Sequence, residues 1–182
     1  GTSSRDLPKE KGGYTVGVLV QTNFGGILTI DGVPVGEELD NFYMNNQVPY
    51  TVDGSCMMVI ATDAPLSDRN LKRLAKRSFL AFGRVGSFSS NGSGDYSIAF
   101  STHRDLRIPY NSEEDVRTIL DLKNDELSPL FLAVVEAAEE AIYNSMFMAT
   151  DVTGQKGRTL KALPIDKTLQ IMNKHDGEKS KN

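Results

Sequence analysis

The dipeptide Gly54-Ser55 is the pair in this chain best suited to carry out a reaction, because a flexible glycine meets a hydroxyl residue directly before a strand-like apolar run. A serine hydroxyl there can attack the glycyl carbonyl, move the acyl group from nitrogen to oxygen, and leave an ester for water to hydrolyse. The freed serine then carries a nucleophilic hydroxyl and an α-amine that can act as its base. Glycine tolerates the strained backbone that this attack needs, although most Gly-Ser pairs are ordinary turns.

Two further sets of polar residues suit the same chemistry. Ser93 and Asp95 end a stretch rich in Gly and Ser, and their side chains point the same way if a strand begins there. They could orient an α-amine and a serine hydroxyl; the alternative is a turn in which the aspartate caps the backbone. Asn23 stands at a strand break beside Gly25-Gly26, where its amide could donate to an oxyanion or simply form an Asx turn.

A histidine-dependent serine hydrolase is another reading that the residues leave open. The chain has two histidines, His103 and His175. His103 follows a predicted strand and could reach a site, whereas His175 lies in a polar tail that is expected to be disordered from Asn173 onward. No Gly-x-Ser-x-Gly nucleophile elbow surrounds Ser55, which weakens this reading.

Length and composition restrict the classes of protein to which the chain can belong. Its 182 residues are enough for one domain with a sizeable core. The formal net charge of −4 argues against nonspecific nucleic-acid binding, and no apolar run approaches the roughly 20 residues of a membrane span. The single Cys56 excludes an intrachain disulfide, and no Cys/His cluster has the spacing of a zinc site.

The elements that must position these residues are strands separated by turns or helices. Strands are predicted at residues 14–21, 27–30, 33–35, 55–62 and 96–101, with an Asp31-Gly32 turn. The run at 55–62 is nearly continuously apolar, so both faces of that strand are expected to be covered. Loops are expected at residues 1–13, 36–53 and 83–94.

Two long helices are predicted from their apolar periodicity. One covers residues 67–82 with Ser67 as its N-cap, and the other begins at Ser128-Pro129. Short helices are expected near residues 113–122 and 165–172. The order of strands, helix, strand and long helix predicts a layered α/β or α+β sandwich.

Taken together, the motifs resemble those of the DmpA-type L-aminopeptidase/D-esterase family, which includes the β-peptidyl aminopeptidases. Several independent motifs occur in the family's order, and the resemblance covers nearly the whole chain. They are Gly1-Thr2-Ser3-Ser4-Arg5, Gly17-Val18-Leu19-Val20-Gln21-Thr22-Asn23-Phe24-Gly25, Gly54-Ser55, Ala61-Thr62-Asp63-Ala64-Pro65-Leu66, Leu71-Lys72-Arg73-Leu74-Ala75, Ser93-Gly94-Asp95-Tyr96-Ser97-Ile98-Ala99-Phe100-Ser101-Thr102 and Glu140-Ala141-Ile142-Tyr143-Asn144.

The resemblance implies an inactive precursor that cuts itself between Gly54 and Ser55, so that residues 1–54 end an α chain and residues 55–182 form a β chain. Ser55 would be the nucleophile and Asn23 the oxyanion-hole amide. Ser93 and Asp95 match the family's second serine and its carboxylate, which is Glu in the best-known members. The implied fold is a DmpA/ornithine-acetyltransferase-like α-β-β-α sandwich that resembles N-terminal-nucleophile hydrolases but differs from them in connectivity.

The implied activity is that of a self-processing serine aminopeptidase or amidase. It would release N-terminal amino acids from peptides, amides or esters through an acyl-enzyme on Ser55, with no metal or cofactor. Family members have a long N-terminal portion that supplies strands, part of the pocket and a catalytic tyrosine. This chain is therefore expected to be the C-terminal part of the fold, with that portion and further αβ units as partners.

Three expectations complete this interpretation. A cytoplasmic location is expected, without nucleic-acid or membrane partners. One alternative is a noncatalytic structural or assembly fragment, or a relative, of the same family. The other is the histidine-dependent hydrolase, in which His103 would be essential.

Overall fold

A central four-stranded sheet organises the computed structural model, which describes residues 1–45, 54–111, 113 and 115–179. The strands lie in the order β1-β2-β3-β4, with antiparallel β1/β2 and β2/β3 pairs and a parallel β3/β4 pair. Their bounds are β1 Thr2–Asp6, β2 Thr15–Asn23, β3 Ser55–Thr62 and β4 Tyr96–Ser101. The strands predicted at 14–21, 55–62 and 96–101 are thus confirmed.

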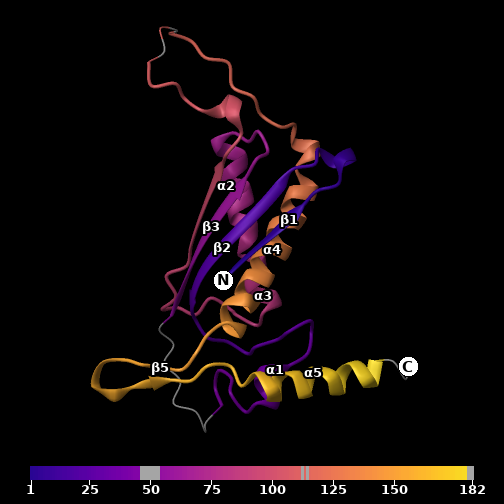
Figure 1. Cartoon of the computed structure of the whole chain (residues 1–182), viewed down its shortest axis with the longest axis vertical. Helices are drawn as coiled ribbons and strands as arrows, with labels where there is room; N and C mark the ends of the chain where they lie inside the picture. The colour runs from indigo at the N-terminus through magenta and orange to yellow at the C-terminus, as the bar shows by residue number, and fades with distance from the viewer. Residues whose placement is uncertain (46–53, 112, 114, 180–182) are drawn as a thin grey trace.

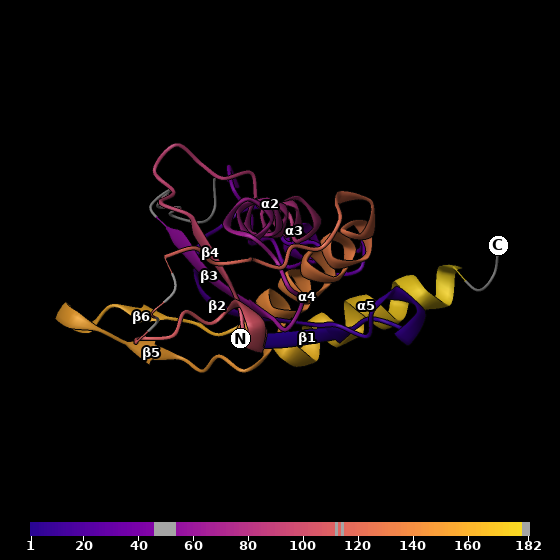
Figure 2. The same cartoon turned by 90° about the horizontal axis from the view of Figure 1, so that it is seen from above.

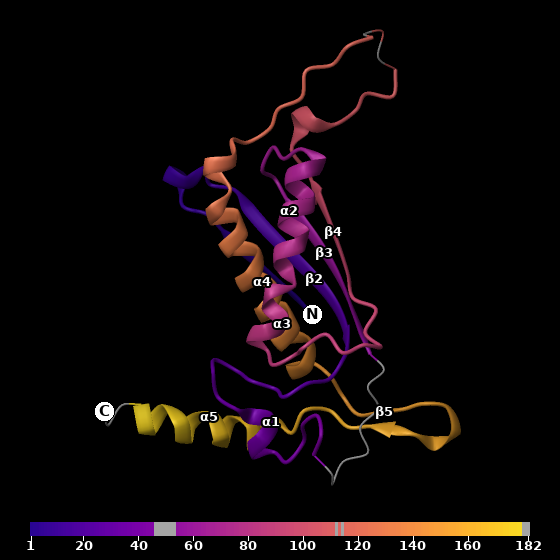
Figure 3. The same cartoon turned by 180° about the vertical axis from the view of Figure 1, so that it is seen from behind.

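Helices cover one face of this sheet, as Figures 1 and 3 show from opposite sides. The helices are α2 (Asp68–Ser78), α3 (Leu80–Arg84) and α4 (Ser128–Phe147). The view from above in Figure 2 places them together on the same side of the strands. α4 lies along β1 and β2, whereas α2 packs beside β4 and against α4.

The main core lies between the sheet and these helices because every second strand residue faces them. In β3 the buried residues are Cys56, Met58, Ile60 and Thr62, and in β2 they are Val16, Val18 and Val20. Leu74 of α2 and the stripe of α4 that includes Leu130 and Val134 fill the other side. This alternation fixes the register, because a slip by one residue would turn the core residues outward.

The opposite face of the sheet is strongly apolar, and none of the described elements covers it. Met57 and Val59 of β3 are exposed there, as are Ile98 (63%) and Phe100 (46%) of β4. The expectation that both faces of the 55–62 strand are covered is therefore wrong for the described residues. They form one helical layer and one sheet layer of the expected α-β-β-α sandwich.

A second, smaller cluster lies at one end of the sheet. Ile30, Val33 and Val35 are buried there beside α5, which runs from Ile165 to Lys179 across the long axis of the molecule (Figure 1). α1 (Val35–Glu38) contacts α5 in this cluster. The predicted Asp31-Gly32 turn is confirmed, since both residues have positive φ between the bridged residues 30 and 33.

The remaining elements are short. A hairpin of β5 (Val152–Thr153) and β6 (Thr159–Leu160) projects beside the body, and its strands are not among the predicted elements. The 3-10 helices are η1 Lys9–Lys11, η2 Arg104–Leu106, η3 Asn124–Glu126 and η4 Gln155–Gly157. No helix in the described part of the chain combines the length and the apolarity needed to cross a membrane.

Three local predictions are wrong, each because a tertiary contact decides the conformation. The segment 1–13 contains β1, which Arg5 fixes to α4 through Glu136 and Glu140, with N···O distances of 3.3 and 2.5 Å. The tail beyond Asn173 is helical to residue 179 because α5 packs on the second cluster. The loop expected at 36–53 includes part of α1, and its residues 46–53 lie outside the described residues.

The short helix expected near 113–122 does not form among the described residues of that range. Asp121 accepts hydrogen bonds from Ser67 N (2.9 Å) and from Asn70 at the start of α2, and Leu122 N donates to Pro65 O. The segment is therefore held extended against the β3–α2 turn. Ser67 is the N-cap as predicted, with its hydroxyl accepting from Asn70 N.

Candidate active site

Ser55, Asn23 and the segment 93–95 meet at one edge of the sheet. Asn23 is the last residue of β2 and lies directly opposite Ser55, the first residue of β3. The register of β3 with β4 pairs Met57 with Tyr96, so the residues just before Tyr96 lie beside the start of β3. Four predicted site residues that are far apart in the sequence are thereby brought together.

The Ser55 hydroxyl faces the turn between Ser93 and Asp95. Gly94 N donates to Ser55 Oγ at 3.2 Å. A Cβ on Gly94 would lie 3.3 Å from that same oxygen, so glycine permits this close approach. Because Ser55 Oγ accepts this hydrogen bond, its own hydroxyl proton stays available for transfer to a base.

Asp95 uses both carboxylate oxygens to organise the backbone next to Ser55. Its Oδ1 accepts from Cys56 N at 2.9 Å, and its Oδ2 accepts from Ser93 Oγ at 2.8 Å. Because Ser93 donates its hydroxyl proton to Asp95, the Ser93 oxygen keeps its lone pairs to accept a proton from another donor. Asp95 thus reaches Ser55 through the Cys56 amide, for which an aspartate is long enough.

Cys56 follows Ser55 but is fully buried on the helix-covered face. Burial raises the pKa of the Cys56 thiol to about 12, and the nearby Asp95 carboxylate adds to this effect. The thiol therefore stays protonated near neutral pH, and its side chain is enclosed on the face of the sheet opposite to that of Ser55.

Asn23 presents an exposed side chain at the position opposite Ser55. Directly opposite residues in an antiparallel pair share a face of the sheet, with Cβ atoms roughly 4.5–5.5 Å apart. The amide group is therefore close enough to serve a carbonyl attacked by Ser55. The oxyanion role of Asn23 stays a prediction.

Gly54 is packed tightly against the end of β2. A Cβ built on Gly54 would lie 2.3 Å from Asn23 O and 2.8 Å from Phe24 Cα, which are backbone atoms that cannot move aside easily. Only glycine fits this position without displacement. The peptide bond between Gly54 and Ser55 thus lies between the Asn23 strand end and the Gly94 N–H.

The two histidines lie away from this edge. His103 lies two residues beyond the end of β4, and its Nδ1 accepts a hydrogen bond from Asp105 N at the start of η2. Since β3 and β4 are parallel and Ser55 begins β3, the length of the strand separates them, on the order of 20 Å. His175 contacts Glu38 between α5 and α1. The structure therefore contradicts a catalytic triad that joins Ser55 to His103 or His175 of this chain.

Two contributors to the site had no signal in the sequence. The Gly94 and Cys56 amides are backbone groups, and any residue type except proline would carry them. Only the strand register shows that they point at Ser55 Oγ and at Asp95. Among the residues that the structure describes, no group of three or more His, Cys, Asp or Glu side chains could hold a metal ion.

Comparisons with known proteins match most of this chain. The model of peptidase family S58 matches residues 1–160. The β-peptidyl aminopeptidase BapA of Sphingosinicella microcystinivorans is 41% identical over 96% of this chain and 47% of its own length. The chain spans about half the length of the curated relatives it matches.

Solved structures confirm the fold. The PH0078 protein from Pyrococcus horikoshii OT3 is 44% identical, with a TM-score of 0.83 over 96% of this chain and 47% of that one. An l-aminopeptidase d-ala-esterase/amidase from Ochrobactrum anthropi is 33% identical, with a TM-score of 0.82 over 97% and 48%. It is described as a prototype for the serine aminopeptidases and a new variant of the Ntn hydrolase fold, and this chain shares that fold. The chain belongs to peptidase family S58.

Proposed function

We propose that this chain is the nucleophile-bearing portion of a self-processing serine aminopeptidase. The observation that carries the proposal is the meeting of Ser55, Asn23, Ser93 and Asp95 at one sheet edge, with Gly94 N donating to Ser55 Oγ. Membership of family S58 supports the same activity. Processing would separate residues 1–54 from residues 55–182.

Self-cleavage uses the Gly54 carbonyl as the electrophile. Ser55 Oγ attacks the carbonyl carbon, the C–N bond to Ser55 breaks, and the hydroxyl proton ends on the Ser55 nitrogen. Asn23 and backbone N–H groups hold the oxyanion. Water then hydrolyses the ester, which leaves a carboxylate on Gly54 and a free α-amine on Ser55.

Turnover repeats the attack on a substrate. The Ser55 α-amine, whose ordinary pKa is about 8, takes the hydroxyl proton as Oγ attacks the acyl carbonyl, and then delivers it to the leaving amine. Asp95 holds the neighbouring Cys56 amide, and Ser93 offers an oxygen that can accept from the α-amine. Water then attacks the acyl-enzyme, with the amine again acting as base.

The close packing of backbone atoms around Gly54 favours one class of substrate. During turnover the substrate's N-terminal residue occupies the place of Gly54, so a side chain on its α-carbon meets Asn23 O and Phe24 Cα. An acyl residue with an unsubstituted carbon next to the carbonyl avoids this clash. A β-amino acid substituted at its β-carbon has that form, and the name of the BapA relatives points to the same class.

Replacing Gly54 by alanine is expected to slow self-cleavage by roughly 10- to 100-fold, because the new Cβ pushes the carbonyl away from its position beside Asn23. The measurement is the rate at which the full-length protein splits on a denaturing gel. Gly83→Ala is the matched control, since a Cβ there has open space within 4 Å. Equal splitting rates for the two variants would refute the packing argument.

The uncovered sheet face supports a partner made of a second sheet. Its apolar residues, Leu19, Met57, Val59, Ile98 and Phe100, need a cover to leave water. We propose that the part of the relatives that this chain does not span supplies that sheet. Assembly of several αβ units is also proposed, and the exposed Ile108 and Tyr110 support it. A cytoplasmic location stays a prediction.

Release of p-nitroaniline from β-alanine p-nitroanilide by the full-length protein tests the proposed activity. We expect hydrolysis by the wild type, and near-wild-type rates for His103→Ala because that side chain lies at the far end of β4. Ser93→Ala should lose about 10²- to 10⁴-fold in turnover, the range typical of a proton-transfer partner. A folded protein that hydrolyses no amino-acyl anilide would favour the noncatalytic assembly role, which the bare sheet face would also suit.

A further inference from the structure

Three arginines of α2 converge beside η3 and the first turn of α4. Arg69, Arg73 and Arg77 are spaced four residues apart, so their side chains follow one another along one face of the helix. α2 packs against α4, and Figure 3 shows the two helices side by side. Like charges at this spacing repel one another, so other groups must hold these three side chains, the arginine cluster, in place.

Two amide oxygens hold the first two arginines together. Asn124 Oδ1 accepts from Nη1 of Arg69 at 3.1 Å and from Nη1 of Arg73 at 2.8 Å. Asn70 Oδ1 accepts from the same two nitrogens at 3.3 and 2.9 Å. Asn70 is only 1% exposed, and its Nδ2 donates to both carboxylate oxygens of Asp121, which turns Oδ1 toward the arginines. The two guanidinium groups are therefore kept next to each other.

The third arginine is fixed by an aromatic ring and by the backbone of α2. Arg77 Cζ lies 3.5 Å from the centroid of the Phe131 ring, in the first turn of α4, and Arg77 Nη1 donates to Arg73 O at 2.9 Å. Arg73 Cζ lies 5.2 Å from the same centroid. The arginine cluster is thus ordered by the fold itself, which lowers the entropic cost of binding a ligand there.

The positive charge of the arginine cluster is not neutralised by ion pairs within the described part of the chain. None of the described Asp or Glu side chains forms an ion pair with these arginines. Asp121 attracts Arg69 electrostatically but directs its hydrogen bonds to Ser67 and Asn70. The contacts of all three arginines use Nη1, so their Nε and Nη2 groups have no acceptor among the described residues. These groups form the edge of a guanidinium that binds an oxyanion with two parallel hydrogen bonds.

We infer that the arginine cluster binds a phosphate group. A tetrahedral phosphate has enough oxygens and charge to accept from several guanidinium groups at once, whereas a carboxylate offers two oxygens and a single charge. The start of α4 adds partial positive charge nearby, since its N-cap residue Leu127 forms no side-chain cap. The Arg77 guanidinium already covers the Phe131 ring, so no stacking surface is left there for a nucleobase. The phosphate group itself is therefore the ligand.

Titration of the full-length protein with sodium phosphate, at an ionic strength held constant with sodium chloride, tests this assignment. Calorimetry should detect saturable binding, and the melting temperature should rise with phosphate but not with chloride. Arg73→Gln should raise the Kd for phosphate by about 10- to 100-fold, because charge-assisted hydrogen bonds are lost. Arg73→Lys keeps the charge but loses the planar pair of donors, and should weaken binding by several-fold.

Arg158→Gln is the matched control, because it removes the same charge at an exposed position of the β5–β6 hairpin, at the other end of the molecule from the start of α2 (Figure 1). It should bind phosphate like the wild type. A cooperative melting transition in chloride shows that each variant has folded. No saturable binding of phosphate to the wild type, or equal weakening by Arg73→Gln and Arg158→Gln, would overturn the inference.

Adenosine monophosphate distinguishes free phosphate from a phosphate ester as the source of the ligand. Its Kd should be similar to that of inorganic phosphate, because the covered Phe131 ring offers nothing to the base. Binding of the nucleotide without any binding of inorganic phosphate would contradict the assignment of the arginine cluster to the phosphate group.

Discussion

Ser55→Ala is expected to remain a single uncut chain on a denaturing gel, while the wild type gives two. Alanine removes the hydroxyl that Gly94 N holds beside the Gly54 carbonyl, so neither the acyl shift nor the later attack on substrate can occur. Turnover should fall by on the order of 10⁶-fold, the scale reported when a serine nucleophile is deleted.

Ser128→Ala serves as the matched control for this change. Ser128 is exposed at the first position of α4. The second cluster lies near the other end of that helix. It should process and turn over like the wild type. If Ser55→Ala protein still splits after Gly54, Ser55 is not the group that attacks.

Asn23→Ala is expected to lower kcat by about 10²- to 10³-fold with little change in KM, because an oxyanion donor acts mainly in the transition state. Self-cleavage should slow as well, since the same amide lies opposite the Ser55 that attacks Gly54. The measurement is steady-state hydrolysis by the processed, full-length variant, with processing allowed to reach completion first.

Gln21→Ala provides the comparison, because Gln21 is exposed on β2 two residues before Asn23 and faces the same side of the sheet. It should retain turnover within a few-fold of the wild type. Unchanged kcat for Asn23→Ala, or a loss confined to KM, would remove Asn23 from the oxyanion role.

The sequence was sufficient to predict the elements whose residues carry a strong local pattern. β3 has a nearly continuous apolar run and α4 a long apolar periodicity, while Ser67 and Pro129 mark helix starts by their own chemistry. β1 could not be predicted in this way, because the Arg5 ion pairs with α4 that hold it span more than 130 residues. The exposure of one face of β3 could not be predicted either. An apolar run has the same sequence whether or not a second layer covers that face of the strand.

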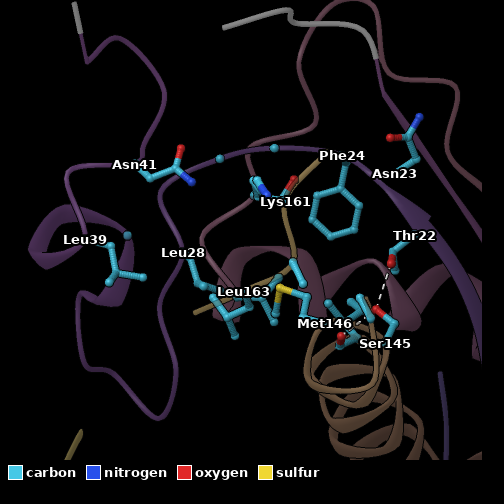
Figure 4. Close-up of a pocket in the computed structure, with 18 of the residues that line it drawn as sticks. Thr22, Asn23, Phe24, Leu28, Leu39, Asn41, Ser145, Met146, Lys161 and Leu163 are labelled. Carbon is cyan, nitrogen blue, oxygen red and sulfur yellow. Dashed lines mark hydrogen bonds between the residues drawn. The ribbon is translucent and has the colours of Figure 1, made fainter. Parts of the chain in front are cut away.

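For the candidate site too, the sequence could predict some features and not others. The side chains of Ser55, Asn23, Ser93 and Asp95 could be selected from residue type and from resemblance to a family. Their meeting at one edge depends on the β2/β3 and β3/β4 registers, which no local pattern specifies. The cavity of ≈ 950 Å³ in Figure 4 was likewise beyond prediction, because its walls come from segments as distant as Leu28 and Leu163.

The mass of the full-length wild-type protein, measured with N-terminal sequencing of each product, tests the central claim most directly. We expect two chains, one ending at Gly54 and one beginning with a free amine on Ser55. A single intact chain in a folded preparation, or a break at any other bond, would contradict the assignment of Ser55 as a self-generated N-terminal nucleophile.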